Sequence, residues 1–280
     1  MVQGTELIRL AIFGQPVASS LSPSIHRMFA EQLGLEIDYQ RIETGPDGFP
    51  GALEAFQAEG GAGCNVTMPL KGDAWQLAAE SSPQAARAQA ANTLIFEPPS
   101  GWFAHTTDGA GLLADLSGNH AVNPAGQRIL ILGAGGAAAG VLGSLLACKP
   151  AGVVLVNRNL KRGRELAQRF STQASVEVVG WETLSGLGAF DLVINATSLG
   201  HKDEAPPLVT SIFASGSVCY DLNYFKASLP LKKRCEEMCQ PYIDGLGMLV
   251  EQAAKSFFIW TAKQPDSRVV IEVCRESFDS

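Results

Sequence analysis

Residues 128–138, RILILGAGGAA, decide the fold of the second half of this chain. The apolar run at 129–132 suits a buried strand, and it ends at Gly133. Together, Gly133, Gly135 and Ala138 fit the pattern G-x-G-x-x-[GA], in which glycine permits a tight turn and lets the backbone approach a pyrophosphate at a helix N-terminus. The next strand is VVLVN at 153–157. This order of strand, turn, helix and strand predicts a dinucleotide-binding α/β unit.

The same region allows a second interpretation, because residues 129–148 contain no charged side chain and are as long as a membrane span. Five glycines fall within them, at positions 133, 135, 136, 140 and 143. Such clustering favours a tight turn and a closely packed helix over a helix that faces lipid. We therefore expect a water-exposed α/β unit and no membrane partner.

The rest of the chain repeats this alternation. Strands are predicted at residues 10–14, 37–43, 63–69, 90–97, 128–133, 153–157, 176–180, 191–197 and 218–224. Helices are predicted at residues 22–34, 49–60, from 108, up to 147, at 160–170 and at 246–260. Alternating strands and helices indicate mostly parallel sheets. A length of 280 residues exceeds one ordinary domain, so we expect two α/β domains.

Composition narrows the class of partner. A net charge of −7 without a basic stripe argues against nucleic acid. The six scattered cysteines and four histidines show no metal-ligand spacing, so reduced thiols and no metal site are expected. The N-terminal residues lack the basic-then-apolar order of a signal peptide, which predicts a cytoplasmic location.

The residues after the second strand indicate which dinucleotide is bound. An NAD site usually has a carboxylate there for the ribose 2′-hydroxyl, whereas this chain has Asn157, Arg158 and Asn159, followed by Arg162. Guanidinium groups can clamp a 2′-phosphate. We therefore predict NADP as the cofactor, although a solvated helix face would also explain these arginines.

Polar residues also gather at predicted strand ends in the first half. They are Ser20, Ser22, Asn65, Thr67, Lys71, Asn92 and Asp108. Hydroxyl and amide groups would suit a small polyhydroxylated acid. A dehydrogenase also needs a group that exchanges the alcohol proton, and Lys71 beside Asp108 can do this.

Seven ordered motifs resemble the shikimate dehydrogenase family. They are FGQPVASSLSPSIH (13–26), GCNVTMPLK (63–71), AANTL (90–94), TTDGAG (106–111), LGAGGAA (132–138), INATSLG (194–200) and DGLGMLVEQAA (244–254). The resemblance implies NADPH-dependent, reversible reduction of 3-dehydroshikimate to shikimate, on the way to chorismate and the aromatic amino acids. It also implies a substrate-binding domain over residues 1–107 and 244–280 and a Rossmann-type NADP-binding domain over residues 108–243. The final helix would return to the first domain.

The resemblance also implies roles for individual residues. Lys71 and Asp108 would be catalytic. Substrate contacts would be Ser20, Ser22, Thr67, Asn92, Asp108, Tyr224 and Gln252. Cofactor contacts would be Gly133, Ala134, Gly135, Gly136, Ala137, Asn157, Arg158, Asn159, Arg162, Thr197, Leu222 and Gly245.

Two alternatives stay open at this point. A related enzyme of the family could use quinate, aminoshikimate or NAD. A protein of the same fold could also sense a ligand without turnover; the presence of both Lys71 and Asp108 argues against that reading. A monomer or a homodimer is expected.

Overall fold

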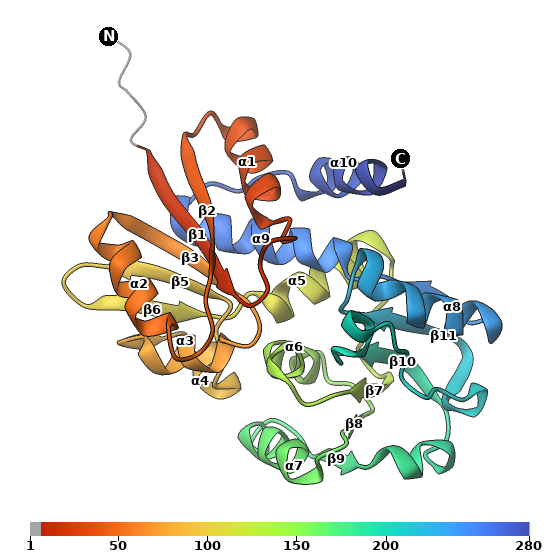
Figure 1. Cartoon of the computed structure of the whole chain (residues 1–280). Helices are drawn as coiled ribbons and strands as arrows, with labels where there is room; N and C mark the ends of the chain where they lie inside the picture. Colours follow the sequence, from red (N-terminus) through yellow and green to blue (C-terminus); the bar gives the residue numbers. More distant parts are fainter. Residues whose placement is uncertain (1–6, 280) are drawn as a thin grey trace. The chain divides into compact units, whose positions relative to one another are not determined.

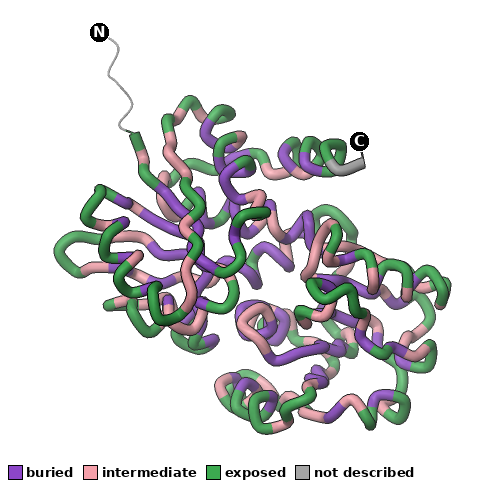
Figure 2. The backbone as a smooth tube through the Cα atoms, in the orientation of Figure 1, coloured by how far each residue is buried: buried purple, intermediate pink, exposed green. Residues whose placement is uncertain are grey.

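The computed structural model describes residues 7–279 and divides into two compact units, Met1–Gly111 with Val250–Ser280 and Leu112–Leu249 (Figure 1). Each unit consists of its own six-stranded sheet and a set of helices. The strands are largely buried, and the connecting loops are largely exposed (Figure 2). The α/β class expected from the alternating pattern is confirmed.

The first unit contains a mixed sheet with the strand order β2-β1-β3-β5-β6-β4. Its strands are β1 (Ile8–Gly14), β2 (Ile37–Glu43), β3 (Gly61–Val66), β4 (Glu80–Ser81), β5 (Thr93–Glu97) and β6 (Gly101–His105). Its helices are α1 (Ser22–Leu33), α2 (Phe49–Ala58), α3 (Lys71–Leu77), α4 (Pro83–Ala88), most of α9 (Leu246–Thr261) and α10 (Ser267–Asp279), together with the start of α5 (Asp108–Ala114).

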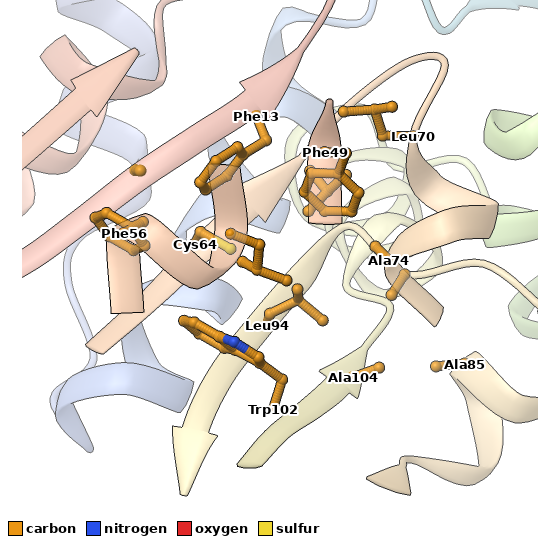
Figure 3. Close-up of a cluster of buried hydrophobic side chains, with 14 residues drawn as sticks. Phe13, Phe49, Phe56, Cys64, Leu70, Ala74, Ala85, Leu94, Trp102 and Ala104 are labelled. Carbon is orange, nitrogen blue, oxygen red and sulfur yellow. The ribbon is translucent and has the colours of Figure 1, made fainter. Parts of the chain in front are cut away.

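Side chains of the first sheet alternate between two faces, as the period of a strand requires. Phe13, Cys64 and Leu94 point to one face and join Phe49 of α2 in an apolar core (Figure 3). Phe13 meets the Phe49 ring edge-on, with centroids 5.5 Å apart. Asn65 lies between Cys64 and Val66 along the strand and therefore faces the opposite side, which α1 and α9 cover.

The second unit contains a parallel sheet with the strand order β12-β11-β10-β7-β8-β9. Its strands are β7 (Arg128–Leu132), β8 (Gly152–Val156), β9 (Val176–Val179), β10 (Phe190–Asn195), β11 (Phe213–Asp221) and β12 (Tyr242–Ile243). Its helices are η1 (Asp115–Asn119), α6 (Gly136–Ala147), α7 (Leu160–Arg169), η2 (Trp181–Gly186), η3 (Leu199–Lys202), η4 (Thr210–Ile212), η5 (Phe225–Ser228) and α8 (Leu229–Glu237), and the end of α5 and the start of α9 also belong here.

Strand β7 lies in the middle of the second sheet, where the strand order reverses. Strands β8 and β9 lie on one side of β7, and β10, β11 and β12 lie on the other. Alternate residues Leu130 and Leu132 pack into a core with Leu231 of α8. On the other face, α7 lies so close to the sheet that a Cβ at Gly163 would be 2.7 Å from Val178. An order that reverses in this way is typical of dinucleotide-binding sheets, whose ligands bind at the reversal.

Residues 129–148, which had allowed a membrane interpretation, fold as β7 and α6. None of the helices between residues 7 and 279 combines the length and apolar character of a membrane span.

The first sheet differs in one respect from the expected parallel arrangement. The stretch Gly101–His105 forms a strand that the sequence pattern did not indicate, and β5 runs antiparallel to both β3 and β6. Only a short turn separates β5 from β6, so the two strands form a hairpin, which requires antiparallel strands. As a result, the start of β5 lies beside the carboxyl end of β3, where Asn65 pairs with Thr93.

Candidate active site

The predicted catalytic residues lie at one edge of the first sheet. At this edge β1, β3 and β6 end and β5 begins, because β5 runs in the opposite direction. Asn92 therefore precedes its strand, whereas Thr67 follows β3 and Asp108 starts the helix after β6. Lys71 begins α3, one turn after the end of β3.

Lys71 and Asp108 form an ion pair. The Lys71 Nζ donates to Asp108 Oδ2 at 2.5 Å. The two side chains are only 16% and 7% exposed, so water screens this pair much less than it screens a surface salt bridge. An ammonium group that a carboxylate orients at a partly buried edge can deliver a proton to a ligand oxygen.

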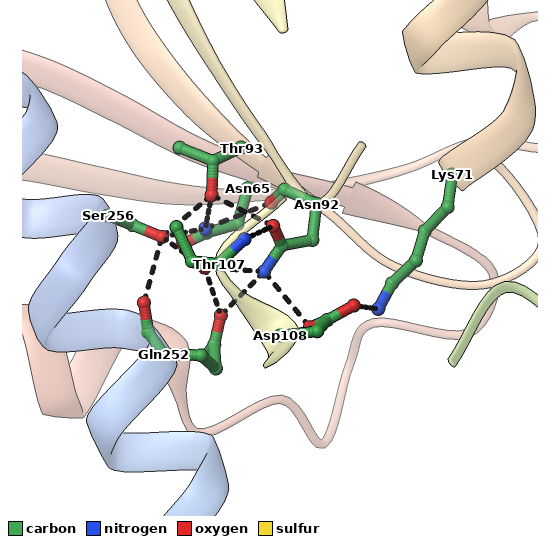
Figure 4. A network of polar contacts seen from close by, with 8 residues as sticks. All are labelled: Asn65, Lys71, Asn92, Thr93, Thr107, Asp108, Gln252 and Ser256. Carbon is green, nitrogen blue, oxygen red and sulfur yellow. Dashed lines mark hydrogen bonds and ion pairs between the residues drawn. The ribbon is translucent and has the colours of Figure 1, made fainter. Parts of the chain in front are cut away.

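Asn92 links this pair to helix α9 (Figure 4). Its Nδ2 lies 3.1 Å from Asp108 Oδ1 and 2.8 Å from Gln252 Oε1. Its Oδ1 accepts a 2.7 Å hydrogen bond from the backbone N–H of Thr107. All four side chains are buried, and the hydrogen bonds fix Asn92, Asp108 and Gln252 relative to one another.

The network extends further through Ser256, which the sequence analysis did not assign to the site. Ser256 Oγ lies 2.7 Å from Thr93 Oγ1, 3.2 Å from Thr107 Oγ1 and 3.1 Å from Asn65 Nδ2. Ser256 follows Gln252 by four residues and therefore shares its face of α9, which is the signal that could have identified it.

His26 and Tyr39 complete the buried side of this network. The Tyr39 hydroxyl donates to Asn65 Oδ1 at 2.7 Å, and His26 Nε2 lies 3.1 Å from the same oxygen. Since Asn65 Nδ2 already donates to other groups, His26 donates through Nε2–H. Burial lowers the pKa of His26 from 6.5 to about 3, so this imidazole is neutral.

Three further predicted substrate contacts lie in the same unit, Ser20 and Thr67 on loops and Ser22 at the start of α1. Ser20 Oγ and Ser22 Oγ are 3.3 Å apart, and Ser20 Oγ also accepts from the Ser22 backbone N–H. The Arg41 guanidinium holds the Ser20 carbonyl at 2.7 Å. Thr67 follows β3, and its backbone N–H donates to Phe13 O. The predicted contact Tyr224 lies in the second unit, directly before η5.

The glycine turn of the second unit connects β7 to α6. Gly133 has a φ of +101°, which L side chains rarely adopt, and a Cβ there would be 3.0 Å from the carbonyl oxygen of Ala196. A Cβ at Gly135 would meet only the Arg162 guanidinium, at 3.8 Å. The predicted contacts Gly133, Ala134, Gly135, Gly136 and Ala137 thus form the turn and the first residues of α6, at the reversal of the sheet.

The next predicted contacts follow β8. Asn159 caps α7 by accepting from the Arg162 backbone N–H, and Asn157 Nδ2 donates to the Asn159 carbonyl. Arg158 is exposed, whereas the Arg162 Nε donates to Ala134 O at 2.8 Å. One arginine is therefore free to reorient, and the other is attached to the glycine turn. No carboxylate occupies this strand end, so the residues present fit a phosphorylated ribose.

Three predicted cofactor contacts lie near the ends of β10, β11 and β12. Thr197 donates its hydroxyl to Asn195 Oδ1 at 2.7 Å, and Leu222 donates its backbone N–H to Asn195 O. A Cβ at Gly245 would be 2.6 Å from the carbonyl oxygen of Leu222, so only glycine fits there. The described residues contain no cluster of three or more histidine, cysteine or acidic groups arranged to hold a metal ion.

Comparison with protein families identifies three consecutive matches. Residues 12–94 match the shikimate dehydrogenase substrate binding domain. Residues 116–202 match shikimate / quinate 5-dehydrogenase, and residues 245–275 match the shikimate 5′-dehydrogenase C-terminal domain.

Individual relatives agree with these matches. A shikimate dehydrogenase (NADP(+)) of Alkalilimnicola ehrlichii is 44% identical over 268 residues, which cover 95% of this chain and 98% of that protein. The crystal structure of an Ael1 enzyme from Pseudomonas putida superposes with a TM-score of 0.86 at 36% identity, covering 95% of this chain and 97% of the other. The enzyme of Thermus thermophilus, described as shikimate 5-dehydrogenase in complex with NADP(H) and shikimate, gives a TM-score of 0.80 at 30% identity and covers 96% and 99% of the two chains.

Proposed function

Because this chain belongs to the shikimate dehydrogenase family, we propose that it catalyses the reversible, NADPH-dependent reduction of 3-dehydroshikimate to shikimate. The observation that carries the proposal is the Lys71–Asp108 ion pair, which Asn92 joins to Gln252 at one edge of the first sheet. The reaction is a step towards chorismate and the aromatic amino acids.

Lys71 acts as the general acid in the direction of reduction. Reduction of a ketone leaves negative charge on its oxygen, and an ammonium group within hydrogen-bond reach stabilises that charge and supplies the proton. Asp108 orients the ammonium through its Oδ2. In the reverse direction the neutral amine takes the proton from the alcohol.

The other polar residues hold the substrate. Asn92, Asp108 and Gln252 offer amide and carboxylate groups to ring hydroxyls, and Thr67 adds a hydroxyl at the exit of β3. Ser20 and Ser22 bind the carboxylate, with Tyr224 as a further substrate contact. The pair of serine hydroxyls 3.3 Å apart supports this role, because a carboxylate accepts hydrogen bonds through two oxygens.

The second unit binds the cofactor, which supplies the hydride when it is bound. The turn of residues 133–137 receives the pyrophosphate, because its backbone N–H groups open helix α6. Arg158 and Arg162 bind the 2′-phosphate, and Asn157 and Asn159 shape the loop that carries them. Thr197, Leu222 and Gly245 contact the nicotinamide end.

The cellular location and the oligomeric state of the protein are also part of the proposal. All six cysteines are free thiols, and four of them are buried, which supports a cytoplasmic location. The chain acts as a monomer or a homodimer. Gel filtration with light scattering would distinguish these two states.

Steady-state kinetics with shikimate and quinate, each paired with NADP and NAD, tests the proposed function. We expect the highest kcat/KM for shikimate with NADP. A higher value for quinate or for NAD would identify the chain as a quinate-using or NAD-using enzyme of the family. Ligand binding without turnover in all four pairings would identify a sensor.

A further inference from the structure

One buried carboxylate lies where the proposed contacts to the nicotinamide end meet. Asp221 is the last residue of β11, and it is completely buried. Its Oδ1 accepts from Asn195 Nδ2 at 2.9 Å, from the Asn223 backbone N–H at 3.0 Å and from Asn223 Nδ2 at 2.8 Å. Its Oδ2 accepts from the Tyr242 hydroxyl at 3.3 Å. Asp221 thus connects the ends of three neighbouring strands.

Asn195 links Asp221 to the Thr197 loop through hydrogen bonds. While its Nδ2 donates to Asp221, its Oδ1 accepts from both the backbone N–H and the hydroxyl of Thr197, at 3.1 and 2.7 Å. Its backbone carbonyl accepts from the Leu222 N–H. The orientation of the Asn195 amide is therefore determined on both sides.

Asn223 links Asp221 to Thr197 and to Gly245 through hydrogen bonds. Its Nδ2 donates to Asp221 Oδ1 and to the Thr197 carbonyl, at 2.8 and 3.1 Å. Its own carbonyl accepts from the Gly245 N–H at 2.9 Å. Each of the three proposed nicotinamide contacts, Thr197, Leu222 and Gly245, is therefore two hydrogen bonds from Asp221.

We propose that Asp221 is a positioning residue that aligns the Thr197, Leu222 and Gly245 segments for the nicotinamide end of the cofactor. This inference rests on the proposed function and goes beyond it, because Asp221 touches neither substrate nor cofactor in that assignment. A single carboxylate oxygen that accepts three hydrogen bonds holds its donors more tightly than a neutral oxygen does. That advantage explains why a charged group occupies a site with no exposure to water.

Burial of the carboxylate has a measurable cost. Burial raises the pKa of Asp221 from 3.8 to about 6, although the hydrogen bonds from Asn223, Asn195 and Tyr242 oppose the shift. Since the charged form opposes folding, a residue kept only for stability would be better neutral. Asp221→Asn separates the two roles, because the amide keeps the shape and one acceptor oxygen but removes the charge.

The experiment compares two ligands at a pH about two units above the pKa of Asp221. NADPH contains the nicotinamide, whereas adenosine 2′,5′-bisphosphate contains only the half that the glycine turn and the arginines would bind. For Asp221→Asn, we expect the Kd of NADPH to rise about fivefold, since charge-assisted hydrogen bonds become neutral ones. The Kd of adenosine 2′,5′-bisphosphate should stay within about twofold of wild type, and the Tm should not fall.

Asp191→Asn is the matched control. Asp191 lies at the opposite end of the same sheet, where its Oδ2 accepts from the Arg128 backbone N–H at 2.8 Å. The Asp191→Asn substitution removes the same charge from the same unit, and both Kd values should stay within about twofold of wild type. Asn223→Ala is a second test variant in case Asp221→Asn fails to fold, and we expect the same selective loss of NADPH affinity from it.

An unchanged Kd of NADPH in the test variants would overturn the inference. An equal loss of affinity for both ligands would also overturn it, because that result indicates a general structural role. The proposed function fails separately, if wild type binds NADPH but does not oxidise or form shikimate. A wild-type chain that does not bind NADPH would overturn both proposals.

Discussion

The Nζ of Lys71 lies 2.5 Å from Oδ2 of Asp108, although 37 positions separate the two residues in the chain. Lys71 starts α3 and Asp108 starts α5, so two helix starts at one sheet edge bring the charges together. Asp108 is also held through its second oxygen by Asn92. The ammonium therefore has a defined direction.

Replacement of this ammonium should affect turnover more than binding. We expect Lys71→Ala to lower kcat by about 10²- to 10⁴-fold, the usual contribution of a positioned acid–base group. The KM for shikimate should change much less, because the proposed ring contacts Asn92 and Gln252 remain. This pattern indicates an interaction made chiefly in the transition state, and steady-state kinetics measures it.

A lysine elsewhere in the same unit provides the control for this prediction. Lys255 is exposed on α9, and Lys255→Ala should leave both constants unchanged. A Lys71→Ala variant that keeps the wild-type kcat and loses only affinity would show that Lys71 binds substrate and that the proton follows another route.

The two arginines after β8 should contribute differently to cofactor choice. Arg158 is exposed. Arg158→Ala should weaken the binding of NADP by about 1.5–3 kcal/mol, the range for hydrogen bonds to a charged group, and leave the binding of NAD almost unchanged. Arg162 also holds the Ala134 carbonyl of the glycine turn, so Arg162→Ala should raise the KM of both cofactors. The KM values for NADP and NAD in each variant measure this.

Arg164→Ala serves as the control, because Arg164 is exposed on the same helix but lies beyond the loop. We expect neither KM to change. Equal effects of Arg158→Ala on NADP and NAD would show that Arg158 does not read the 2′-phosphate.

Much of the fold could be predicted from the sequence because buried parallel strands read as short apolar runs. This holds for β7, β8 and β10, where the turn after β7 also carries a motif with a known geometry. The hairpin of β5 and β6 could not be predicted in the same way. Only alternate residues of the GWFAH stretch, Trp102 and Ala104, are buried, so β6 does not read as a continuous apolar run. Its pairing partner is the preceding strand β5, in antiparallel orientation, and not a parallel strand reached through a helix.

The candidate site could likewise be predicted only in part. Lys71, Asn92 and Asp108 were predicted because each follows or precedes a recognisable strand. Ser256 was not, because a serine within a helix resembles a surface residue until its contacts with Asn65 and Thr93, both far away in the chain, are known. Asp221 ends an apolar strand, so its position was a signal, but its three donors become apparent only in the folded unit.

Helix α5 packs against α9 so closely that Gly111 has no space for a side chain. A Cβ at Gly111 would be 2.6 Å from both the Cβ and the backbone nitrogen of Gln252. We expect Gly111→Ala to lower the free energy of unfolding by about 1–3 kcal/mol, the usual cost of overpacking. It should also raise the KM for shikimate, because it displaces Gln252. Urea unfolding and kinetics measure the two effects.

Gly51→Ala is the matched control for this prediction. Gly51 lies within helix α2, and a Cβ there would meet no atom within 4 Å. Alanine is preferred to glycine in a helix, so this variant should gain about 0.5–1 kcal/mol. If Gly111→Ala also gained stability and kept its KM, the contact between α5 and α9 would have to be looser than the structure shows.

His26 should make the stability of the first unit depend on pH. Its ring stacks on Tyr39 at 4.7 Å, is surrounded by Phe29, Phe257 and Trp260, and meets no charged side chain among these neighbours. Its Nε2 is bonded to Asn65, and its Nδ1 is buried without a hydrogen-bond partner. A proton on Nδ1 would therefore be a buried charge with nothing to stabilise it.

The direction of this dependence follows from the two pKa values. His26 takes up a proton near pH 6.5 in the unfolded chain but only at about 3 in the folded unit. Between these values the unfolded chain binds more protons, so the free energy of unfolding falls as the pH falls, by up to about 1.4 kcal/mol per pH unit. Since carboxylates add slopes of their own, the measurement is the difference between wild type and His26→Phe in urea unfolding from about pH 8 to about pH 5. We expect this difference to be constant above about pH 7 and to shift against wild type below it. A difference that stays constant over the whole range would mean that water reaches the His26 ring and that its pKa is not lowered.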